Sequence, residues 1–269
     1  MSTEQDKIKD LVKERYGARA ERVINLAPVE QDHSNDPSYG CSSNDACCGI
    51  EDNDHAMQLY TEGQLAGLPA ESVAASAGCG NPTALAGLQP GERVLDLGSG
   101  GGIDCFLASQ QVGPTGQVTG LDMTPSMLKL ADTNKAKLGI KNVEFVQGEM
   151  ANMPIPDSSV DVIISNCVVC LSPDKDAVFS ESFRVLSPGG RIHLSDVMAL
   201  TDEGPSVSSP EDWVSCTAGA EHVDVYRGRL VRAGFTDIEF TSEEADYMKN
   251  RDERPPTNTA GYKVVAHKP

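Results

Sequence analysis

Basic side chains are scarce in this sequence. Its 269 residues hold 22 Lys and Arg against 40 Asp and Glu, which gives a formal net charge of -18 at pH 7. No segment gathers lysine and arginine into a cluster. Because proteins bind nucleic acids through cations that neutralise the phosphates, we expect no nucleic-acid partner. The acidic excess itself indicates solubility and no particular ligand.

Long apolar runs are missing as well. The longest, VDVIISNCVVCL at 160–171, is too short and too polar to cross a bilayer. The N-terminal stretch MSTEQDKIKDLVKERYG is charged throughout and lacks the apolar core of a secretory signal. We therefore expect no contact with a membrane and a cytoplasmic location.

Cysteine is too sparse for a disulfide scaffold, yet it is more frequent than a core requires. In a reducing compartment the eight cysteines would rest as thiols, which favours metal, redox or nucleophilic roles. For any single buried cysteine, packing as a small apolar side chain remains the default. The eight are Cys41, Cys47, Cys48, Cys79, Cys105, Cys167, Cys170 and Cys216.

Short apolar runs alternate with helix-forming stretches from about residue 90 onward. This alternation implies right-handed crossovers and a parallel sheet that helices cover on both faces. The runs are apolar on both faces, as burial on both sides requires. We therefore predict a doubly wound, Rossmann-like α/β domain. Strands are expected at 93–98, 117–122, 142–148, 160–166 and 191–197, and helices at 103–113, 125–139 and 174–186.

Two regions flank this domain. Residues 2–26 have the apolar spacing of an amphipathic helix, and residues 27–55 are polar and turn-rich, which predicts a mobile loop. After residue 198, a helical stretch near 212–234 and strands at 236–242 and 261–267 predict a smaller α+β region.

The segment DLGSGGG, 96–102, follows the first expected strand and opens a helix. Its glycines permit tight turning and let a ligand approach the backbone closely. Asp122, at the tip of the next strand, is placed to accept hydrogen bonds from both hydroxyls of an adenosine ribose. A dinucleotide fingerprint would need glycine at position 103, where the chain has Ile103.

The spacing D-x-G-x-G-x-G resembles motif I of the class I S-adenosylmethionine-dependent methyltransferases. The resemblance implies that the amino-acid end of this cofactor meets the glycine loop, that its ribose meets Asp122 and that its adenine lies near Glu149. The methyl acceptor would lie over the carboxyl ends of the strands, where Cys167 ends the fourth strand. The implied cofactor-binding residues are Asp96, Gly98, Ser99, Gly100, Gly102, Asp122, Met123, Glu149, Met150 and Asn166.

The acceptor decides which further residues matter. An oxygen or nitrogen acceptor normally calls for a general base, and no histidine-centred group stands out: His193 falls within a strand, which favours a structural role, and His222 stays open. Three thiols from separated segments, Cys79, Cys167 and Cys216, could instead converge on one soft centre. Trivalent arsenic is such a centre, and it keeps a lone pair for attack on a methyl group.

The contexts of these cysteines resemble those of arsenite S-adenosylmethionine methyltransferases, over about residues 75–220. The resemblance implies that arsenite, or its thiol conjugate, is bound by Cys79, Cys167 and Cys216 and is methylated by S-adenosylmethionine. The matching motifs are GCGNP (78–82), VLDLGSGGGIDCFLAS (94–109), GLDMTPSML (120–128), SNCVVCLSPDK (165–175), FRVLSPGGRIHLSDV (183–197) and W-x-x-C-x-x-G-A (213–220).

The same resemblance implies a redox cycle. After methyl transfer, protein thiols would reduce the arsenic and leave a disulfide between an N-terminal cysteine and Cys79, which thioredoxin or glutathione would reduce. Of Cys41, Cys47 and Cys48, we take Cys41 as the partner. The implied division of the chain is an N-terminal helix with a mobile cysteine-containing segment (1–70), an S-adenosylmethionine-binding methyltransferase domain (71–198) and a C-terminal arsenic-binding region (199–269).

Cys170 departs from the family pattern, in which asparagine is common at this position. It could be a spare thiol, a fourth ligand or a disulfide partner of Cys167. Cys105 is assigned to packing. Two other functions stay open: a class I carbon or oxygen methyltransferase of quinone or sterol type, which would need no thiols, and a non-enzymatic thiol-rich metal-binding module.

Overall fold

The computed structural model describes residues 3–25, 59–201, 209, 213, 216–242 and 258–269. Cys41, Cys47 and Cys48 lie outside the described residues, so the disulfide partner of Cys79 stays a prediction. Within the described residues, no helix combines the length and the apolar character that a membrane span requires.

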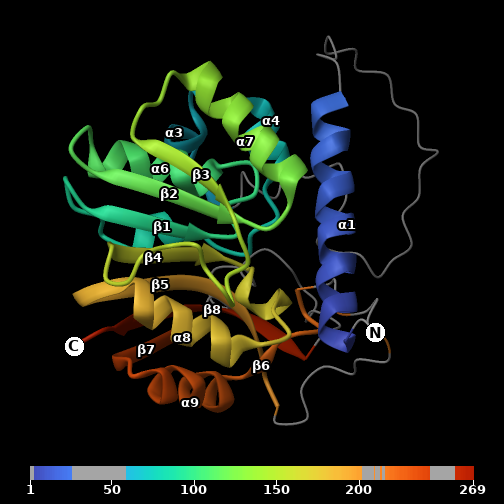
Figure 1. Cartoon of the computed structure of the whole chain (residues 1–269), viewed down its shortest axis with the longest axis vertical. Coiled ribbons are helices and arrows are strands. Elements are labelled where there is room, and N and C mark those ends of the chain that lie inside the picture. The colour runs from blue at the N-terminus through green and yellow to red at the C-terminus, as the bar shows by residue number, and fades with distance from the viewer. Residues whose placement is uncertain (1–2, 26–58, 202–208, 210–212, 214–215, 243–257) are drawn as a thin grey trace.

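One mixed sheet organises the chain, in the order β3-β2-β1-β4-β5-β8-β7, with β6 paired to β5 (Figure 1). The pairings from β3 to β5 are parallel, whereas β8 runs antiparallel to both β5 and β7. The predicted doubly wound α/β fold is confirmed. The strands are β1 (Arg93–Leu97), β2 (Gln117–Asp122), β3 (Val143–Gln147), β4 (Val160–Asn166), β5 (Leu186–Ala199), β6 (Glu221–His222), β7 (Thr236–Ser242) and β8 (Thr259–His267).

Helices connect and cover these strands. They are α1 (Glu4–Asn25), α3 (Glu62–Leu65), α4 (Ala70–Ala75), α5 (Pro82–Leu85), α6 (Ile103–Val112), α7 (Pro125–Leu138), the 3-10 turn η1 (Val169–Leu171), α8 (Lys175–Val185) and α9 (Val223–Ala233). Local chemistry sets several ends: the Asp174 side chain accepts a hydrogen bond from the amide of Ala177 at 3.0 Å and caps α8, while left-handed Gly139 ends α7.

Two boundaries differ from the sequence prediction. The helix expected near 212–234 begins only at Val223, because His222 caps it and 216–219 form turns. The strand expected at 191–197 begins at Leu186, because the SPGG segment at 187–190 stays in the strand as an irregular stretch. There the register with β4 moves from Val160–Leu186 to Val162–Arg191.

The two faces of the sheet bury different cores. Val94 and Val162 point to one face and pack with Phe106 of α6. Leu95 and Ile163, one residue further along the same strands, point to the other face and pack with Phe179 of α8. Side chains alternate between the faces of a strand, so burial of both sets explains why these strands read as continuous apolar runs.

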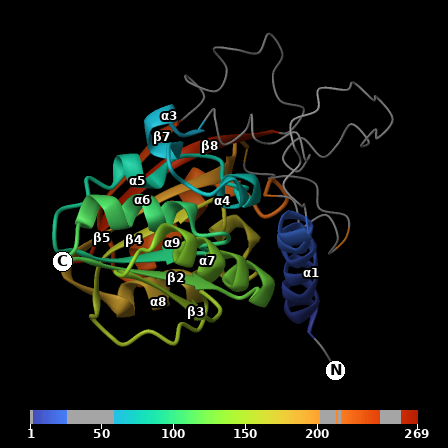
Figure 2. The same cartoon turned by 90° about the horizontal axis from the view of Figure 1, so that it is seen from above.

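The predicted N-terminal helix is present as α1 and stands beside the sheet (Figures 1 and 2). Its Ala20 and Val23 pack with Met127 of α7, and its Ile8 and Val12 belong to the apolar cluster around Cys167. The sheet extends without interruption past residue 198 into β8 and β7, so the C-terminal region shares one sheet with the strands before it.

Candidate active site

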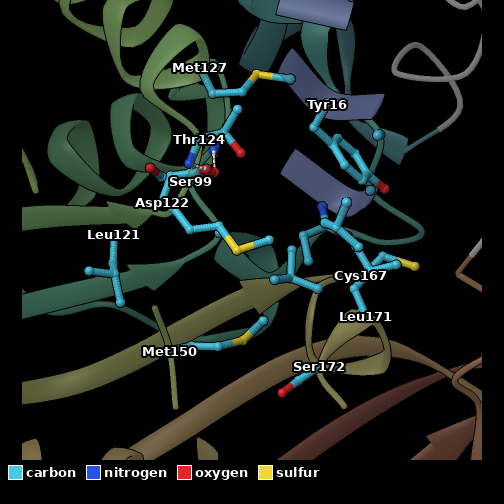
Figure 3. A pocket seen from close by; sticks show the side chains of 18 of the residues that line it. Tyr16, Ser99, Leu121, Asp122, Thr124, Met127, Met150, Cys167, Leu171 and Ser172 are labelled. Carbon is cyan, nitrogen blue, oxygen red and sulfur yellow. Dashed lines mark hydrogen bonds between the residues drawn. The ribbon is translucent and has the colours of Figure 1, made fainter. Parts of the chain in front are cut away.

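A cavity of about 1070 Å³, including space open to solvent, lies where β1, β2, β3 and β4 end. Its lining comes from the glycine loop after β1, the end of β2, the segment 148–151 after β3, the end of β4 and helix α1. Figure 3 shows Ser99 and Asp122 on one side of this space, with Tyr16 and Cys167 on the opposite side. Carboxyl ends of parallel strands are the usual place for a ligand in such folds.

The glycine loop is held tightly against β2 and β4. The amides of Gly98 and Ser99 both donate to the carbonyl oxygen of Leu121, at 2.7 and 3.0 Å. Gly98 has a φ of 69°, and a Cβ there would lie 2.5 Å from the side chain of Val168. Only glycine satisfies both the left-handed backbone and this close approach. The Ser99 hydroxyl oxygen is buried and has no hydrogen-bond partner among the described residues.

Asp122 fixes the loop from the tip of β2. Its Oδ2 accepts from the amide of Gly100 at 2.9 Å, and its Oδ1 accepts from the amide of Thr124 at 2.8 Å. Burial raises the pKa of this carboxyl, and the backbone hydrogen bonds from Thr124 and Gly100 partly offset the rise. The carboxylate is therefore oriented in advance, at the cavity wall.

Glu149 ties helix α1 to the cavity. Its carboxylate lies 2.6 Å from Nζ of Lys9 and 3.4 Å from Nζ of Lys13. The hydrogen bond from Lys9 lowers the pKa of Glu149. Because Lys9, Val12 and Tyr16 all line the cavity, α1 forms one of its walls.

Eight of the ten predicted cofactor-binding residues line this cavity, namely Gly98, Ser99, Gly100, Asp122, Met123, Glu149, Met150 and Asn166. Gly102 does not; it is the left-handed N-cap of α6. Asp96 does not either. It is buried in β1 and accepts a hydrogen bond from the thiol of Cys105 at 3.2 Å, and burial together with neighbouring Asp104 raises its pKa. Asp96 and Cys105 thus pair with each other in the buried core, outside the cavity.

A cluster of thiols lies beside the cavity. The Sγ atoms of Cys167, Cys170 and Cys216 lie within 4.8 Å of one another, and all three cysteines are buried. Cys79 is half-buried, and its side chain hydrogen-bonds to that of Cys167. The structure therefore brings the three predicted thiols, Cys79, Cys167 and Cys216, to one place. It also adds Cys170, whose role sequence reasoning left open.

Cys167 belongs to both the cavity and the cluster. It lines the cavity, whereas the other three cysteines do not. Its φ of 58° is left-handed, which is uncommon for a residue with a side chain, and its amide donates to the carbonyl oxygen of Ser195 at 2.7 Å. This unusual backbone turns the chain directly after β4 and is held by the neighbouring strand.

The cluster favours one thiolate, on Cys216. Hydrogen bonds from Cys167 and Cys170 place the pKa of Cys216 well below its ordinary value. The pKa of Cys167 is raised well above its ordinary value by hydrogen bonds with Cys170, Cys216 and Cys79. The phenol oxygen of Tyr16, on α1, lies 4.0 Å from Sγ of Cys216. A thiolate is the form of cysteine that attacks and binds soft metals and metalloids.

Asn166 positions the segment that carries Cys79. Its Oδ1 accepts from the amides of Cys79 and Gly80, at 2.9 and 3.0 Å, and its Nδ2 donates to the Gly80 carbonyl oxygen at 2.7 Å and to the Tyr60 hydroxyl at 3.0 Å. A Cβ on Gly78 would lie 2.2 Å from this amide. Sequence reasoning proposed Asn166 only as a cofactor residue, because these partners lie 86 to 106 positions away.

Trp213 and Gly219 attach the Cys216 turn to η1. The indole N–H of Trp213 donates to the carbonyl oxygen of Leu171 at 3.1 Å. A Cβ on Gly219 would lie 1.8 Å from the carbonyl oxygen of Cys170. The motif W-x-x-C-x-x-G thus has a local physical reason: its tryptophan and glycine bring Cys216 against Cys170.

Asp196 and Tyr226 complete the surroundings of Cys170, and sequence reasoning missed both. The Cys170 side chain hydrogen-bonds to Asp196, whose pKa burial raises to about 6. The Tyr226 hydroxyl donates to Oδ2 of Asp196 at 3.2 Å. His193, expected to be structural, lies within β5 and does not line the cavity, and His222 caps α9.

Comparison with known proteins places this chain in a family. A profile described as "Methyltransferase domain" matches residues 88–253. An arsenite methyltransferase of Halobacterium salinarum is 41% identical over 252 residues, covering 92% of this chain and 62% of the relative. An arsenite methyltransferase of Aquipseudomonas alcaligenes is 37% identical over 209 residues, covering 74% of this chain and 58% of the relative. The chain thus spans about three fifths of the length of these curated relatives.

Solved structures agree with these matches. The crystal structure of an arsenic(III) S-adenosylmethionine methyltransferase from Chlamydomonas reinhardtii has a TM-score of 0.61 to this chain at 37% identity, covering 76% of this chain and 71% of that one. The profile match includes the glycine loop, Asp122, three of the four clustered cysteines and most of the sheet. The chain belongs to the methyltransferase-domain family, in which it is similar to the arsenite methyltransferases.

Proposed function

We propose that this protein transfers methyl groups from S-adenosylmethionine to trivalent arsenic held by cysteine thiolates. One observation carries the proposal: Cys167 lines the strand-end cavity and at the same time belongs to the buried thiol cluster. A ligand of the thiols would therefore lie next to a ligand of the cavity. The names of the relatives and of the solved structure agree with this reading.

The cavity residues fit S-adenosylmethionine. The buried Ser99 hydroxyl lacks a partner among the described residues, and Gly98 and Gly100 of the same loop line the cavity beside it. The loop 98–100 would hold the amino-acid end, Asp122 would accept the ribose hydroxyls, and Glu149 with Met150 would flank the adenine. When bound, the cofactor supplies an electrophilic methyl group on a sulfonium.

The thiol cluster fits the acceptor. Cys167 and Cys216 are only 4% and 7% exposed, so an arsenic atom bound there would be shielded from water. Thiolates suit a soft trivalent centre, and bonds to sulfur leave the arsenic lone pair free for attack on the methyl group. The protein then contributes by holding the two partners in line and excluding water. Cys167 and Cys216 would be the persistent ligands, with Cys79 beside them as the third predicted thiol.

The redox part of the cycle belongs to the same proposal. The half-buried Cys79 lies at the side of the cluster, where it could pair with Cys41 after methyl transfer. Thioredoxin or glutathione would then return the disulfide to thiols by exchange, as suits a cytoplasmic protein. A carbon or oxygen methyltransferase of quinone or sterol type would use the same cavity, but it gives no role to four adjoining thiols.

The test is incubation of the protein with arsenite, S-adenosylmethionine and a thiol reductant, followed by speciation of the arsenic. We expect methylated arsenicals from the wild-type protein and none from Cys167→Ser or Cys216→Ser, both of which should still bind S-adenosylmethionine. Cys105→Ser is the control, because Cys105 is buried away from the cluster. Normal methylation by the Cys167 variant would overturn the proposal.

A further inference from the structure

The three sulfurs that lie closest together are not the three that the family resemblance implies, which are those of Cys79, Cys167 and Cys216. The three sulfurs that lie mutually within 4.8 Å are those of Cys167, Cys170 and Cys216, and Cys79 is outside this group. Cys79 is also the most exposed of the four, since Cys170 is 1% exposed and Cys79 is half-buried. The compact triad therefore contains the cysteine at the position where the family commonly has asparagine.

Cys170 is fixed in the triad from several sides. It lies in η1, three residues after Cys167, so the tight turn returns its side chain toward the end of β4. The close approach of Gly219 to the Cys170 carbonyl keeps the Cys216 turn against it. The side-chain hydrogen bond to Asp196 gives Cys170 a polar partner in an otherwise apolar cluster. The turn and Gly219 hold the backbone of Cys170, and the bond with Asp196 holds its thiol beside those of Cys167 and Cys216.

We infer that Cys170 is a ligand of inorganic trivalent arsenic, and that Cys167, Cys170 and Cys216 form its resting three-sulfur site. This inference rests on the proposed function and assigns the third position to Cys170 in place of Cys79. Cys79 is then left at the edge of the site, where it can enter the disulfide step.

The binding step balances without an oxidant. Arsenous acid carries three hydroxyl groups. Three As–S bonds form as three As–O bonds break. Two hydroxides leave as water with the thiol protons of Cys167 and Cys170, and the third, displaced by the Cys216 thiolate, takes its proton from solvent, so arsenic stays trivalent. An arsenical with one As–C bond has only two exchangeable groups and can bind only two of the thiols. The triad is therefore matched to unmethylated arsenite, and Cys170 is a specificity residue for it.

The experiment uses the full chain with Cys41, Cys47 and Cys48 changed to serine, so that only the described cysteines can supply sulfur. X-ray absorption at the arsenic edge counts the sulfurs per bound arsenic. We expect three in this background, three again when Cys79→Ser is added and two when Cys170→Ser is added. The Cys79 variant keeps the whole triad, so its count decides the matter even if the Cys170 variant folds poorly.

Fluorescence of Trp213, the one tryptophan of the sequence, reports binding because its indole contacts the η1 backbone. We expect Cys170→Ser to weaken arsenite binding by roughly tenfold or more, since one tethered ligand of three is lost. Binding of phenylarsine oxide, which takes two thiols, should change less than about threefold because Cys167 and Cys216 remain.

A count of two sulfurs in the Cys79 variant, with three kept in the Cys170 variant, would overturn the inference and leave the proposed function standing. Equal losses of affinity for both arsenicals in Cys170→Ser would also overturn it. Absence of arsenite binding in the wild-type chain would instead refute the proposed function, and the inference with it.

Discussion

The strand-end cavity and the thiol cluster adjoin at Cys167, yet they are built in different ways. The cavity is built mainly from short segments at the ends of adjacent strands, and one of its bonds joins Asp122 at the end of β2 to the amide of Gly100 in the loop after β1. The cluster gathers four sulfurs from three separated segments and depends on contacts between residues far apart in the chain, such as Trp213 with Leu171. The cavity is therefore a property of the fold, whereas the cluster is a property of this sequence on that fold.

The largest expected effect comes from a change that disturbs both the cavity and the thiol cluster. Gly98→Ala places a methyl group on a left-handed residue and 2.5 Å from the side chain of Val168, next to Cys167. The left-handed backbone alone costs about 1–2 kcal/mol, and the overlap must also move the loop or β4. We expect methylation to fall by about a hundredfold or more and cofactor affinity to fall with it, measured by turnover and by calorimetric titration.

Gly139→Ala is the matched control for this change. Gly139 has a φ of 66°, close to that of Gly98, but a Cβ there would meet nothing within 4 Å. Gly139→Ala should lower the melting temperature, because alanine is unfavourable in the left-handed region, and it should leave turnover unchanged. Equal turnover in the two variants would show that the approach of Gly98 to Val168 does not matter.

The second change acts where the cavity and the cluster meet, because Asn166 lines the cavity and also holds the Cys79 segment. Asn166→Ala removes the acceptor of the Cys79 and Gly80 amides, together with the bonds that its Nδ2 donates to Tyr60 and Asp104. Unpaired amides of this kind cost about 1–3 kcal/mol, so the Cys79 segment should loosen. We expect faster alkylation of Cys79 by iodoacetamide and roughly tenfold slower methylation.

The control for this variant is Asn142→Ala. Asn142 also joins backbone segments, through its bonds to the carbonyl oxygens of Ser109 and Gly113, but it lies away from the thiols. An unchanged alkylation rate for Cys79 in Asn166→Ala would remove Asn166 as its positioning residue.

These contrasts match what the sequence could and could not predict. The strands were predictable within a few residues, because runs such as 160–166 are apolar on both faces. The convergence of Cys167 and Cys216 was predictable from their motifs. The role of Asn166 was not, since its partners are distant in sequence. The position of Cys170 was not either, because it depends on one 3-10 turn and on the space left by Gly219.

A third change tests the stability of the sheet that carries the cavity and the thiol cluster. Burial, with Arg191 and His267 nearby, lowers the pKa of His193 from 6.5 to about 4, despite the opposing effect of Glu92. The unfolded chain therefore binds a proton that the folded chain does not, so stability is lost as the pH falls from about 6.5 through about 4. The loss from this group reaches up to about 3 kcal/mol. His193→Leu should remove it, which chemical denaturation of both proteins from pH 7 to pH 4 would measure. Parallel pH profiles would contradict the assignment.

The smallest expected effect concerns helix α1, the element that contacts both the cavity and the thiol cluster through Lys9 and Tyr16. Glu149→Gln removes the ion pairs with Lys9 and Lys13, whose side chains are about one quarter to one third exposed. Partly exposed pairs contribute about 0–1 kcal/mol, so we expect a change in stability of that size that shrinks as salt rises. If Glu149 also contacts the adenine, the KM for S-adenosylmethionine should rise more than stability falls. Glu71→Gln, which breaks the Lys137 pair between α4 and α7, is the matched control. The Glu71–Lys137 pair lies away from the cavity. If KM rose equally in Glu149→Gln and Glu71→Gln, the role of Glu149 would be to hold α1 in place and not to contact the cofactor.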